Sequence, residues 1–335
     1  MNSYRVLKNQ SFSFGEYALV PIRFEDRYKI MQWRNEQIYH LRQNKPLTEK
    51  EQDQYFNEVV AKLFEQDKPN QILFSYLENG ECIGYGGLVH INWVDKNAEI
   101  SFIIDTKLEK EGFHKHWSIY LQLIEKFAFV ELSLHKIYTF AFNLRPNLYT
   151  ALENSAFKKE AELKEHCLFD KNYISVIIHS KLNLGINLRE ANDGDLLDTF
   201  SWVNNETIRM FSLSKNNVTL EEHTNWFKNK INDKNCFYLI ASIKEEKIGS
   251  IRFDVINKEY AQISYLLKPE WHGKGIGLQI LNTGVNLFLE NHKINEVRGL
   301  VLTSNVASIK VFNRLGFIKI KEEEDSILFS KKRIV

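Results

Sequence analysis

The chain has little of what disulfide-bonded, metal-binding or membrane-spanning proteins need. Its three cysteines, Cys82, Cys167 and Cys236, are far apart and lack any C-x-x-C spacing. We interpret them as small buried apolar side chains, and we predict no metal site. The start of the chain has no basic segment leading into a long apolar run, and no stretch approaches the length of a membrane span. The sequence therefore predicts a cytoplasmic protein with no membrane partner.

An excess of one charge is also lacking. The 44 Lys and Arg residues face 43 Asp and Glu residues, which gives a formal net charge of +1 and no reason to expect a nucleic-acid partner. Hydrophobic residues make up 44% of the chain and charged residues 26%, as in soluble globular proteins. A length of 335 residues is enough for two domains with separate cores.

The second half of the chain repeats the order of the first. Both Thr48-Glu-Lys-Glu51 and Thr219-Leu-Glu-Glu222 have the T-x-x-E form of a capping box that opens a helix. The stretch from Glu99 to Ile104 (EISFII) returns 163 positions later as QISYLL. A repeat of this size indicates two copies of one fold, with domains at 1–182 and 183–335. The predicted class is α/β (α+β), each copy having a central mixed, mostly antiparallel sheet flanked by helices.

A turn rich in glycine separates a predicted strand at 261–267 from a predicted helix at 276–289. Gly273, Gly275 and Gly277 let the main chain adopt positive φ and approach a ligand closely. A helix that begins there aims unpaired N–H groups and the positive end of its dipole at one place, which suits a phosphate. The spacing fits neither the P-loop nor the G-x-G-x-x-G dinucleotide pattern. The turn therefore predicts a diphosphate cradle, with an ordinary helix-entry turn as the alternative.

The residues that follow complete a recognisable pattern. After the turn and one further strand, the chain reads Asn305-Val-Ala-Ser308-Ile-Lys-Val-Phe312-Asn-Arg-Leu-Gly-Phe. This resembles the GNAT superfamily of N-acetyltransferases, whose acetyl-CoA loop reads Arg/Gln-x-x-Gly-x-Gly/Ala. The later helix of that family reads Asn-x-x-Ala/Ser-x-x-x-Tyr-x-x-x-Gly-Phe. His272 stands at the Arg/Gln position, and Phe312 stands where the family has Tyr.

The resemblance implies that acetyl-CoA is the cofactor and that it lies in a V between the strand ending at Leu267 and the strand at 297–302. Main-chain groups of Leu266 and Leu267 would pair with the pantetheine arm. N–H groups of Gly273 to Gly277 would hold the diphosphate. The expected cofactor-binding residues are Leu266, Leu267, His272, Gly273, Lys274, Gly275, Ile276, Gly277, Asn305, Ser308 and Phe312.

Transfer in this family is direct attack of a neutral amine on the thioester, so the site must take one proton and supply another. Phe312 cannot donate a proton, and Tyr265 or water would have to do so. The candidates for the base are His223, Glu222 and Asp254. His223 has a suitable ordinary pKa, with a surface or capping histidine as the alternative reading.

The acceptor is expected to be a small-molecule amine. The pattern from Trp202 to Phe227 resembles the branch that acetylates amino sugars linked to nucleotides, whose Trp-Arg-Asn start is intact at 33–35 but has Val203 in the second half. Related motifs occur in branches that act on protein N-termini or polyamines. An antibiotic acceptor, or a regulatory CoA-binding protein without catalysis, is a further alternative. The expected substrate-binding residues are Trp202, Asn204, Arg209, Trp226 and Arg252, unless the aromatic ones belong to the core.

The first half does not keep the same chemistry. On the 163-residue offset Gly112 aligns with Gly275, but Glu109, Glu111 and His114 fall on His272, Lys274 and Gly277. Two acidic side chains would oppose a diphosphate, and the later helix lacks Gly-Phe and needs a gap to align. We expect this half to bind acetyl-CoA poorly or not at all. The oligomeric state, a homodimer included, stays open.

Overall fold

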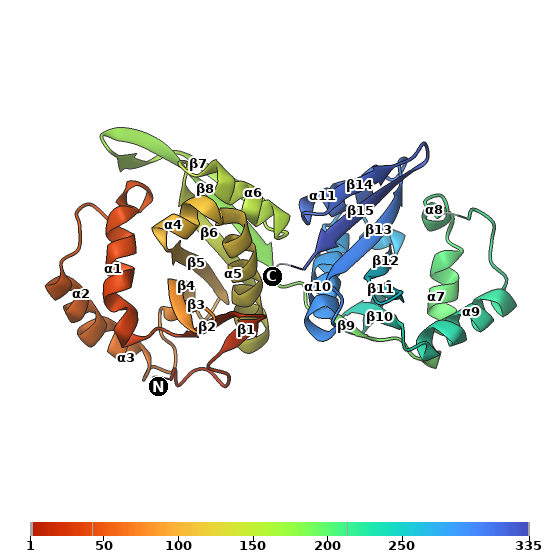
Figure 1. Cartoon of the computed structure of the whole chain (residues 1–335), viewed down its shortest axis with the longest axis horizontal. Helices are drawn as coiled ribbons and strands as arrows, with labels where there is room; N and C mark the ends of the chain where they lie inside the picture. Colours follow the sequence, from red (N-terminus) through yellow and green to blue (C-terminus); the bar gives the residue numbers. More distant parts are fainter. Residues whose placement is uncertain (1–2, 42, 213, 334–335) are drawn as a thin grey trace. The chain divides into compact units, whose positions relative to one another are not determined.

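The chain folds as two compact units, Met1–Asn183 and Leu184–Val335, each built around one sheet (Figure 1). The structure is a computed structural model that describes residues 3–41, 43–212 and 214–333. In each sheet one pair of neighbours is parallel, β5 with β6 and β12 with β13, and the other pairs are antiparallel. The predicted class, two tandem units with mixed and mostly antiparallel sheets, is confirmed.

The first unit has an eight-stranded sheet in the order β1-β2-β3-β4-β5-β6-β8-β7. Its strands are β1 (Phe12–Phe14), β2 (Tyr17–Pro21), β3 (Ile72–Glu78), β4 (Glu81–Asn92), β5 (Asn97–Ile104), β6 (Lys136–Phe142), β7 (Lys158–Phe169) and β8 (Asn172–Leu182). Its helices are η1 (Phe24–Asp26), α1 (Arg27–Glu36), η2 (Ile38–His40), α2 (Glu49–Tyr55), η3 (Phe56–Val60), α3 (Ala61–Leu63), α4 (Thr106–Glu111), α5 (Phe113–Glu125), η4 (Lys126–Glu131) and α6 (Pro146–Asn154).

The second unit has a seven-stranded sheet in the order β14-β15-β13-β12-β11-β10-β9. Its strands are β9 (Ile186–Glu190), β10 (Cys236–Ile243), β11 (Glu246–Ile256), β12 (Tyr260–Leu267), β13 (Glu296–Leu302), β14 (Ile318–Glu322) and β15 (Ser326–Lys332). Its helices are η5 (Asp193–Asp195), α7 (Leu196–Val203), α8 (Glu206–Arg209), α9 (Leu220–Asn232), η6 (Pro269–Trp271), α10 (Ile276–Asn291) and α11 (Val306–Arg314).

Helix α10 sits closely on the sheet of the second unit because a glycine faces it. A Cβ at Gly284 would lie 2.6 Å from Cδ1 of Ile251, so the bare helix surface admits that side chain. Farther along the helix, the rings of Phe288 and Phe253 stack with centroids 4.4 Å apart. This packing is worth more than the ~1 kcal/mol that glycine costs inside a helix. It joins α10 to β11, the strand that pairs with β12.

Both predicted capping boxes are present. Thr48 and Thr219 each accept the N–H of the third helical residue, and the Glu at that position accepts the N–H of its threonine in return. An asparagine side chain also holds the residue before each threonine. Asn35 donates to the carbonyl and accepts from the N–H of Leu47, and Asn204 does the same with Val218. The two units therefore share one loop geometry as well as one element order.

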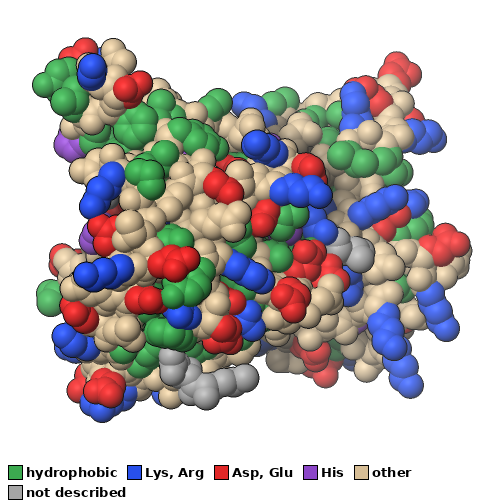
Figure 2. Space-filling model, turned by 60° about the vertical axis from the view of Figure 1, so that its left-hand side comes forward, with side chains coloured by type: hydrophobic (Ala, Val, Ile, Leu, Met, Phe, Trp, Pro, Cys, Tyr) green, Lys and Arg blue, Asp and Glu red, His purple; other side chains and the backbone are tan. Residues whose placement is uncertain are grey.

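Acidic and basic side chains are interspersed over the face drawn in Figure 2, in keeping with the balanced composition. Within residues 3–41, 43–212 and 214–333, no helix is long and apolar enough to span a membrane. The same residues contain no group of three or more His, Cys, Asp or Glu side chains that could hold a metal ion.

Candidate functional site

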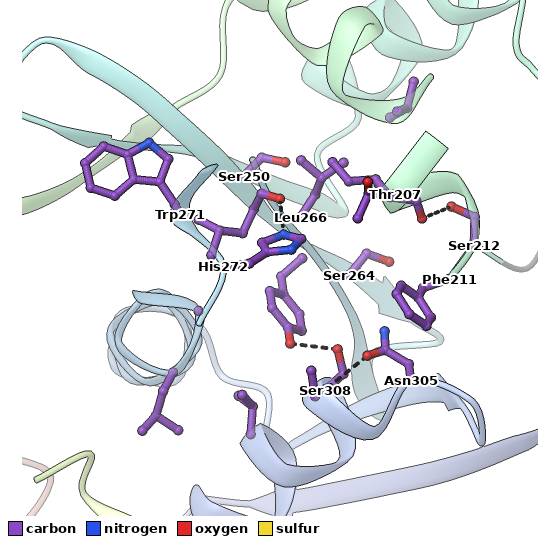
Figure 3. A pocket seen from close by; sticks show the side chains of 18 of the residues that line it. Thr207, Phe211, Ser212, Ser250, Ser264, Leu266, Trp271, His272, Asn305 and Ser308 are labelled. Carbon is purple, nitrogen blue, oxygen red and sulfur yellow. Dashed lines mark hydrogen bonds between the residues drawn. The ribbon is translucent and has the colours of Figure 1, made fainter. Parts of the chain in front are cut away.

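The site of the second unit begins where two parallel strands separate. The ladder between β12 and β13 has three pairs, from Ala261–Val297 to Ile263–Gly299, while β13 stays paired with β15 up to Leu302. Beyond Ile263 the two strands therefore diverge. A cavity of about 620 Å³ lies at this split, lined by β11, β12, α8, α11 and the start of α10 (Figure 3).

The glycine turn forms one wall of the cavity. Gly273 and Gly275 have φ of 72° and 79°, which L side chains rarely adopt. Gly275 is the N-cap of α10 and supplies no side chain to accept from the first N–H groups of that helix. The cavity is lined by Gly273, Gly275 and Gly277. The wall thus offers main-chain donors and the positive end of a helix of 16 residues, a suitable grip for a diphosphate.

His272 holds this turn against the end of β12. Its Nε2 lies 2.8 Å from the carbonyl oxygen of Leu267, so that nitrogen carries the proton and donates it (Figure 3). Lys274 lies over the ring of Trp271, with Nζ 4.9 Å from its centroid, and is not among the residues that line the cavity. Ile276 is buried at 3% exposure. The side chains of Lys274 and Ile276 therefore do not line the cavity, and only the main-chain N–H groups of these two residues remain as candidates for contact with the cofactor.

Register changes one expectation about the pantetheine arm. Lys268 N–H donates to the carbonyl of Ile248 across the β11–β12 ladder. By the alternation of an antiparallel pair, the main chain of Leu266 is also directed to β11, whereas that of Tyr265 and Leu267 is directed to the split. Leu266 lines the cavity, but we correct its expected main-chain role. The groups directed to the split are the N–H and C=O of Tyr265 and the N–H of Leu267.

The helix after β13 brings a hydroxyl pair to the cavity. Asn305 is the N-cap of α11, and its Oδ1 accepts from the N–H of Ser308 at 3.0 Å. Ser308 Oγ is 2.8 Å from the Tyr265 hydroxyl. Burial raises the pKa of Tyr265, with a smaller opposite effect of Ser308, so its phenol keeps its proton at neutral pH. All three residues line the cavity.

Phe312 belongs to the core rather than to the cavity wall. Its side chain is 2% exposed and packs on Phe317 and Phe329. A Cβ at Gly299 would lie 2.2 Å from Cε1 of Phe312, so the ring rests directly on the backbone of β13. The expectation that Phe312 contacts the cofactor is therefore wrong.

None of the three predicted bases lines the cavity. His223 is 2% exposed, contacts Phe227, and has its Nε2 3.0 Å from Thr199 Oγ1; burial lowers its pKa, so it is a neutral core histidine. Glu222 closes the capping box with Thr219 at the exposed start of α9. These two side chains are committed to the structure of the unit.

Asp254 is held by two cations. Its Oδ1 accepts from Lys230 at 2.7 Å and its Oδ2 from Arg252 at 2.9 Å. Burial by itself would raise the pKa of Asp254, but Arg252 and Lys230 outweigh it and the pKa is lowered. A carboxylate stabilised in this way is a poor base, so all three base predictions are corrected.

Among the predicted substrate residues, three line the cavity, namely Arg209, Trp226 and Arg252. The Arg252 guanidinium lies 4.9 Å from the ring centroid of Trp226, while Arg209 Nε donates to the carbonyl of Asn216 at 2.8 Å. Trp202 is 6% exposed, and Asn204 clamps Val218, so neither meets the cavity. Trp202 follows the alternative reading of a core aromatic, whereas the expected substrate role of Asn204 is corrected to a structural one.

Sequence reasoning missed part of the wall. Ser250 and Ser264 come from neighbouring strands, Phe211 and Ser212 from the loop after α8, and Lys310 and Arg314 from one face of α11. The last two occur four residues apart and could have been found from helical periodicity once the helix was assigned. Together, the described lining residues include the cations Arg209, Arg252, Lys310 and Arg314 and no Asp or Glu.

The first unit differs at the corresponding turn. Instead of glycines it has the helix α4, whose Glu109 forms a buried ion pair with Arg145. Gly112 caps α5 with φ of −128°, outside the left-handed region. The later helix does need a gap, as expected: α6 and α11 are equally long and Ala156 takes positive φ (68°) at the place of Gly316 (73°), but these positions are 160 residues apart rather than 163.

Comparison with known proteins gave matches for both units. Residues 186–318 match a family model for an acetyltransferase (GNAT) domain, and residues 19–178 match a second model with the same description. Acetyltransferase PseH of Campylobacter jejuni is 27% identical over 139 residues, which is 42% of this chain and 87% of that protein. An uncharacterised protein of Methanocaldococcus jannaschii is 28% identical over 142 residues, 42% of this chain and 29% of that protein.

Solved structures with a similar fold include spermidine N-acetyltransferase from Vibrio cholerae in complex with CoA and spermine. It is 20% identical, with a TM-score of 0.44, and the match covers 50% of this chain and 96% of that one. A domain from Methanocaldococcus jannaschii is 26% identical, with a TM-score of 0.41, and the match covers 44% of this chain and 98% of that one.

Proposed function

Because the chain belongs to the GNAT acetyltransferases, with two such domains in tandem, and is therefore an acyltransferase that uses acetyl-CoA, we propose that its second unit acetylates a primary amine on an anionic small molecule. A nucleotide-linked amino sugar is the leading candidate. One observation carries the choice of acceptor: besides Lys310 and Arg314, which are proposed for the cofactor, the described lining residues include Arg209 and Arg252 and no Asp or Glu.

The residues at the split fit the cofactor. Acetyl-CoA, when bound, supplies the acetyl thioester. The uncapped start of α10 and the turn at Gly273 and Gly275 would hold its diphosphate through N–H groups. The main chain of Tyr265 and the N–H of Leu267 would meet the pantetheine arm. Lys310 and Arg314, both on the cavity side of α11, would meet further phosphate charge.

The lining favours an acceptor with negative charge elsewhere on the molecule. A polyamine would bring several positive charges toward Arg209 and Arg252 without a carboxylate among the described lining residues to receive them. A phosphate or diphosphate on the acceptor would instead be attracted. Arg252 stacks on Trp226 and is fixed by Asp254, so it is already oriented toward the cavity and loses little freedom on binding.

Of the two proton transfers, only the protonation of the departing thiolate is proposed to need a side chain, and the deprotonation of the amine is not. The same cations disfavour an ammonium beside them and lower its pKa, so the bound amine can release its proton to water without a dedicated base. Tyr265 keeps its proton through burial and is oriented by Ser308, so its Oη is the group proposed to protonate the departing sulfur. It would supply the role that Phe312 cannot fill.

The test compares CoA release with a UDP-linked amino sugar, spermidine, an aminoglycoside and an N-terminal peptide as acceptors. We expect turnover with the anionic acceptor and very little with spermidine. Arg252→Met should raise KM for the anionic acceptor about tenfold or more, because it removes a charged contact. Arg298→Met is the matched control, since Arg298 pairs with Glu296 outside the cavity lining. Preferential use of spermidine would refute the proposed acceptor class.

A further inference from the structure

The first unit has a cavity of its own at the corresponding split. The parallel ladder between β5 and β6 ends at the pair Glu99–Tyr138, and a cavity of about 460 Å³ lies there. Its walls include residues 99–103 of β5, residues 139–142 of β6, and side chains from α1, α5 and α6. The unit has therefore kept a space that could hold a ligand.

The end at which a diphosphate would bind is closed. Glu109 and Arg145 form an ion pair whose side chains are 8% and 15% exposed. Arg145 is the N-cap of α6, as Asn305 is of α11, and Glu109 lies on the 163-residue offset from His272. The helix α4 takes the place of the glycine turn. A buried carboxylate at this position repels a diphosphate, so the cavity does not suit CoA.

Two polar side chains that line the cavity lack partners. Trp117 is 3% exposed and Thr139 is 4% exposed. Among the described residues, Trp117 Nε1 and Thr139 Oγ1 have no hydrogen-bond partner. Buried polar groups are nearly always paired in folded proteins, and one that is not points to an absent partner. Both residues thus bring to the wall of the cavity a donor that is unpaired among the described residues.

One cation in the wall of this cavity has no acidic partner among the described residues. Arg34 lines the cavity, where its Nη1 donates to the Tyr85 hydroxyl at 2.6 Å and its Nε to Gln43 at 3.0 Å. Within the part of the chain that the structure describes, no carboxylate lies within salt-bridge distance of Arg34. Arg145 is paired with Glu109, and Glu99 Oε2 lies 2.9 Å from His90 Nδ1. In the second unit, Val203 takes the place of Arg34.

We propose that the first unit binds a small molecule carrying an oxyanion, with the anion at Arg34 and acceptor groups at Trp117 and Thr139. The geometry favours a ligand without a CoA tail, because the ion pair closes that end. A phosphate ester and a carboxylic acid share this chemistry. The site is separate from the acetyl-transfer site of the second unit and does not depend on the acceptor proposed there.

Two probes distinguish the sources of the anion, UMP for a nucleotide phosphate and glucuronate for a sugar carboxylate. The readout is the indole N–H resonance of Trp117 in the full-length protein labelled with ¹⁵N, assigned by its loss in Trp117→Phe. We expect at least one probe to shift it in a saturable way. Arg34→Val, which copies the second unit, should weaken that probe at least tenfold, because a charged hydrogen bond is lost.

Thr139→Val keeps the test decisive if Arg34→Val does not fold, since it removes only a hydroxyl that has no partner and keeps the shape of the side chain. It should weaken the same probe severalfold. A shift with UMP alone supports a phosphate ligand, and one with glucuronate alone supports a carboxylate. The proposal is overturned if neither probe moves the Trp117 resonance, or if both variants bind the active probe as the natural protein does.

Discussion

Replacing Gly275 with alanine tests whether the conformation of the glycine turn holds the cofactor. Gly275 has φ of 79° at the start of α10, and an L-residue there costs ~1–2 kcal/mol. Gly316 is a matched control with φ of 73°, and a Cβ added to it would meet no atom within 4 Å. Its counterpart Ala156 shows that alanine can occupy this place at φ of 68°. Both substitutions therefore introduce similar strain, but only Gly275 lines the cavity.

The two variants should have similar stability and different affinity. Each ~1 kcal/mol of strain lowers the Tm of a domain of this size by about 2–4 °C. In the Gly275→Ala variant, the free loop can relax to a negative φ, which turns its N–H groups away from the cavity. Restoring the binding conformation then costs ~1–2 kcal/mol, so Kd for CoA rises roughly 5- to 30-fold. Gly316→Ala should leave that Kd unchanged.

Calorimetric titration with CoA gives Kd, and differential scanning calorimetry gives Tm. Gly112→Ala is a third variant, in the first unit, where its Cβ would meet the His116 ring at 2.8 Å. It should disturb that unit and leave CoA affinity intact. A Kd for Gly275→Ala within twofold of the natural protein would refute the reasoning, as would an equal rise for Gly316→Ala. Loss of CoA binding in Gly112→Ala alone would place the donor site in the first unit.

Three further outcomes follow from the structure. Tyr265→Phe should lower kcat roughly 100-fold or more with Kd for CoA unchanged, because a proton donor is lost; steady-state kinetics with unaltered kcat would exclude that role. Asn204→Ala should destabilise the second unit by ~1–3 kcal/mol, since the two main-chain groups of Val218 lose their partner, and equal urea midpoints would contradict this. Burial lowers the pKa of His40 from 6.5 to about 3, so the unfolded chain alone binds this proton between those values. Stability should therefore fall by up to ~1.4 kcal/mol per pH unit below 6.5, and His40→Gln should flatten that slope in urea titrations at pH 7.5, 6.5 and 5.5.

The parts of the site that sequence could predict are those in which residue type alone dictates the backbone. Three glycines between a strand and a helix allow few conformations, and Gly273 and Gly275 do take positive φ. The threonine capping boxes are equally local, since donor and acceptor lie three residues apart. Such features need no knowledge of what packs against them.

The parts that failed depend on which face of an element meets the cavity. His223 and Trp226 are three residues apart on α9, yet only Trp226 lines the cavity, while His223 packs into the core. Asp254 follows Arg252 on the same side of β11, and their mutual ion pair leaves only the arginine at the wall. Neither outcome can be read from spacing, because each is decided by a partner on another element.

The clefts of the two units differ at a pair of residues that depend on each other, Glu109 and Arg145. In the first unit, burial raises the pKa of Glu109, with Arg145 beside it opposing that effect, so the carboxylate is tolerated only with its arginine. Arg145 without Glu109 would instead attract a diphosphate. Replacing Glu109 alone would therefore not restore a diphosphate site. Helix α4 would remain, and the side chain of His114 would still stand where the second unit has the bare backbone of Gly277. The ion pair at the closed end and the cavity at Arg34 are thus separate features of the first unit, so the ligand proposed there need not share the cofactor of the second unit.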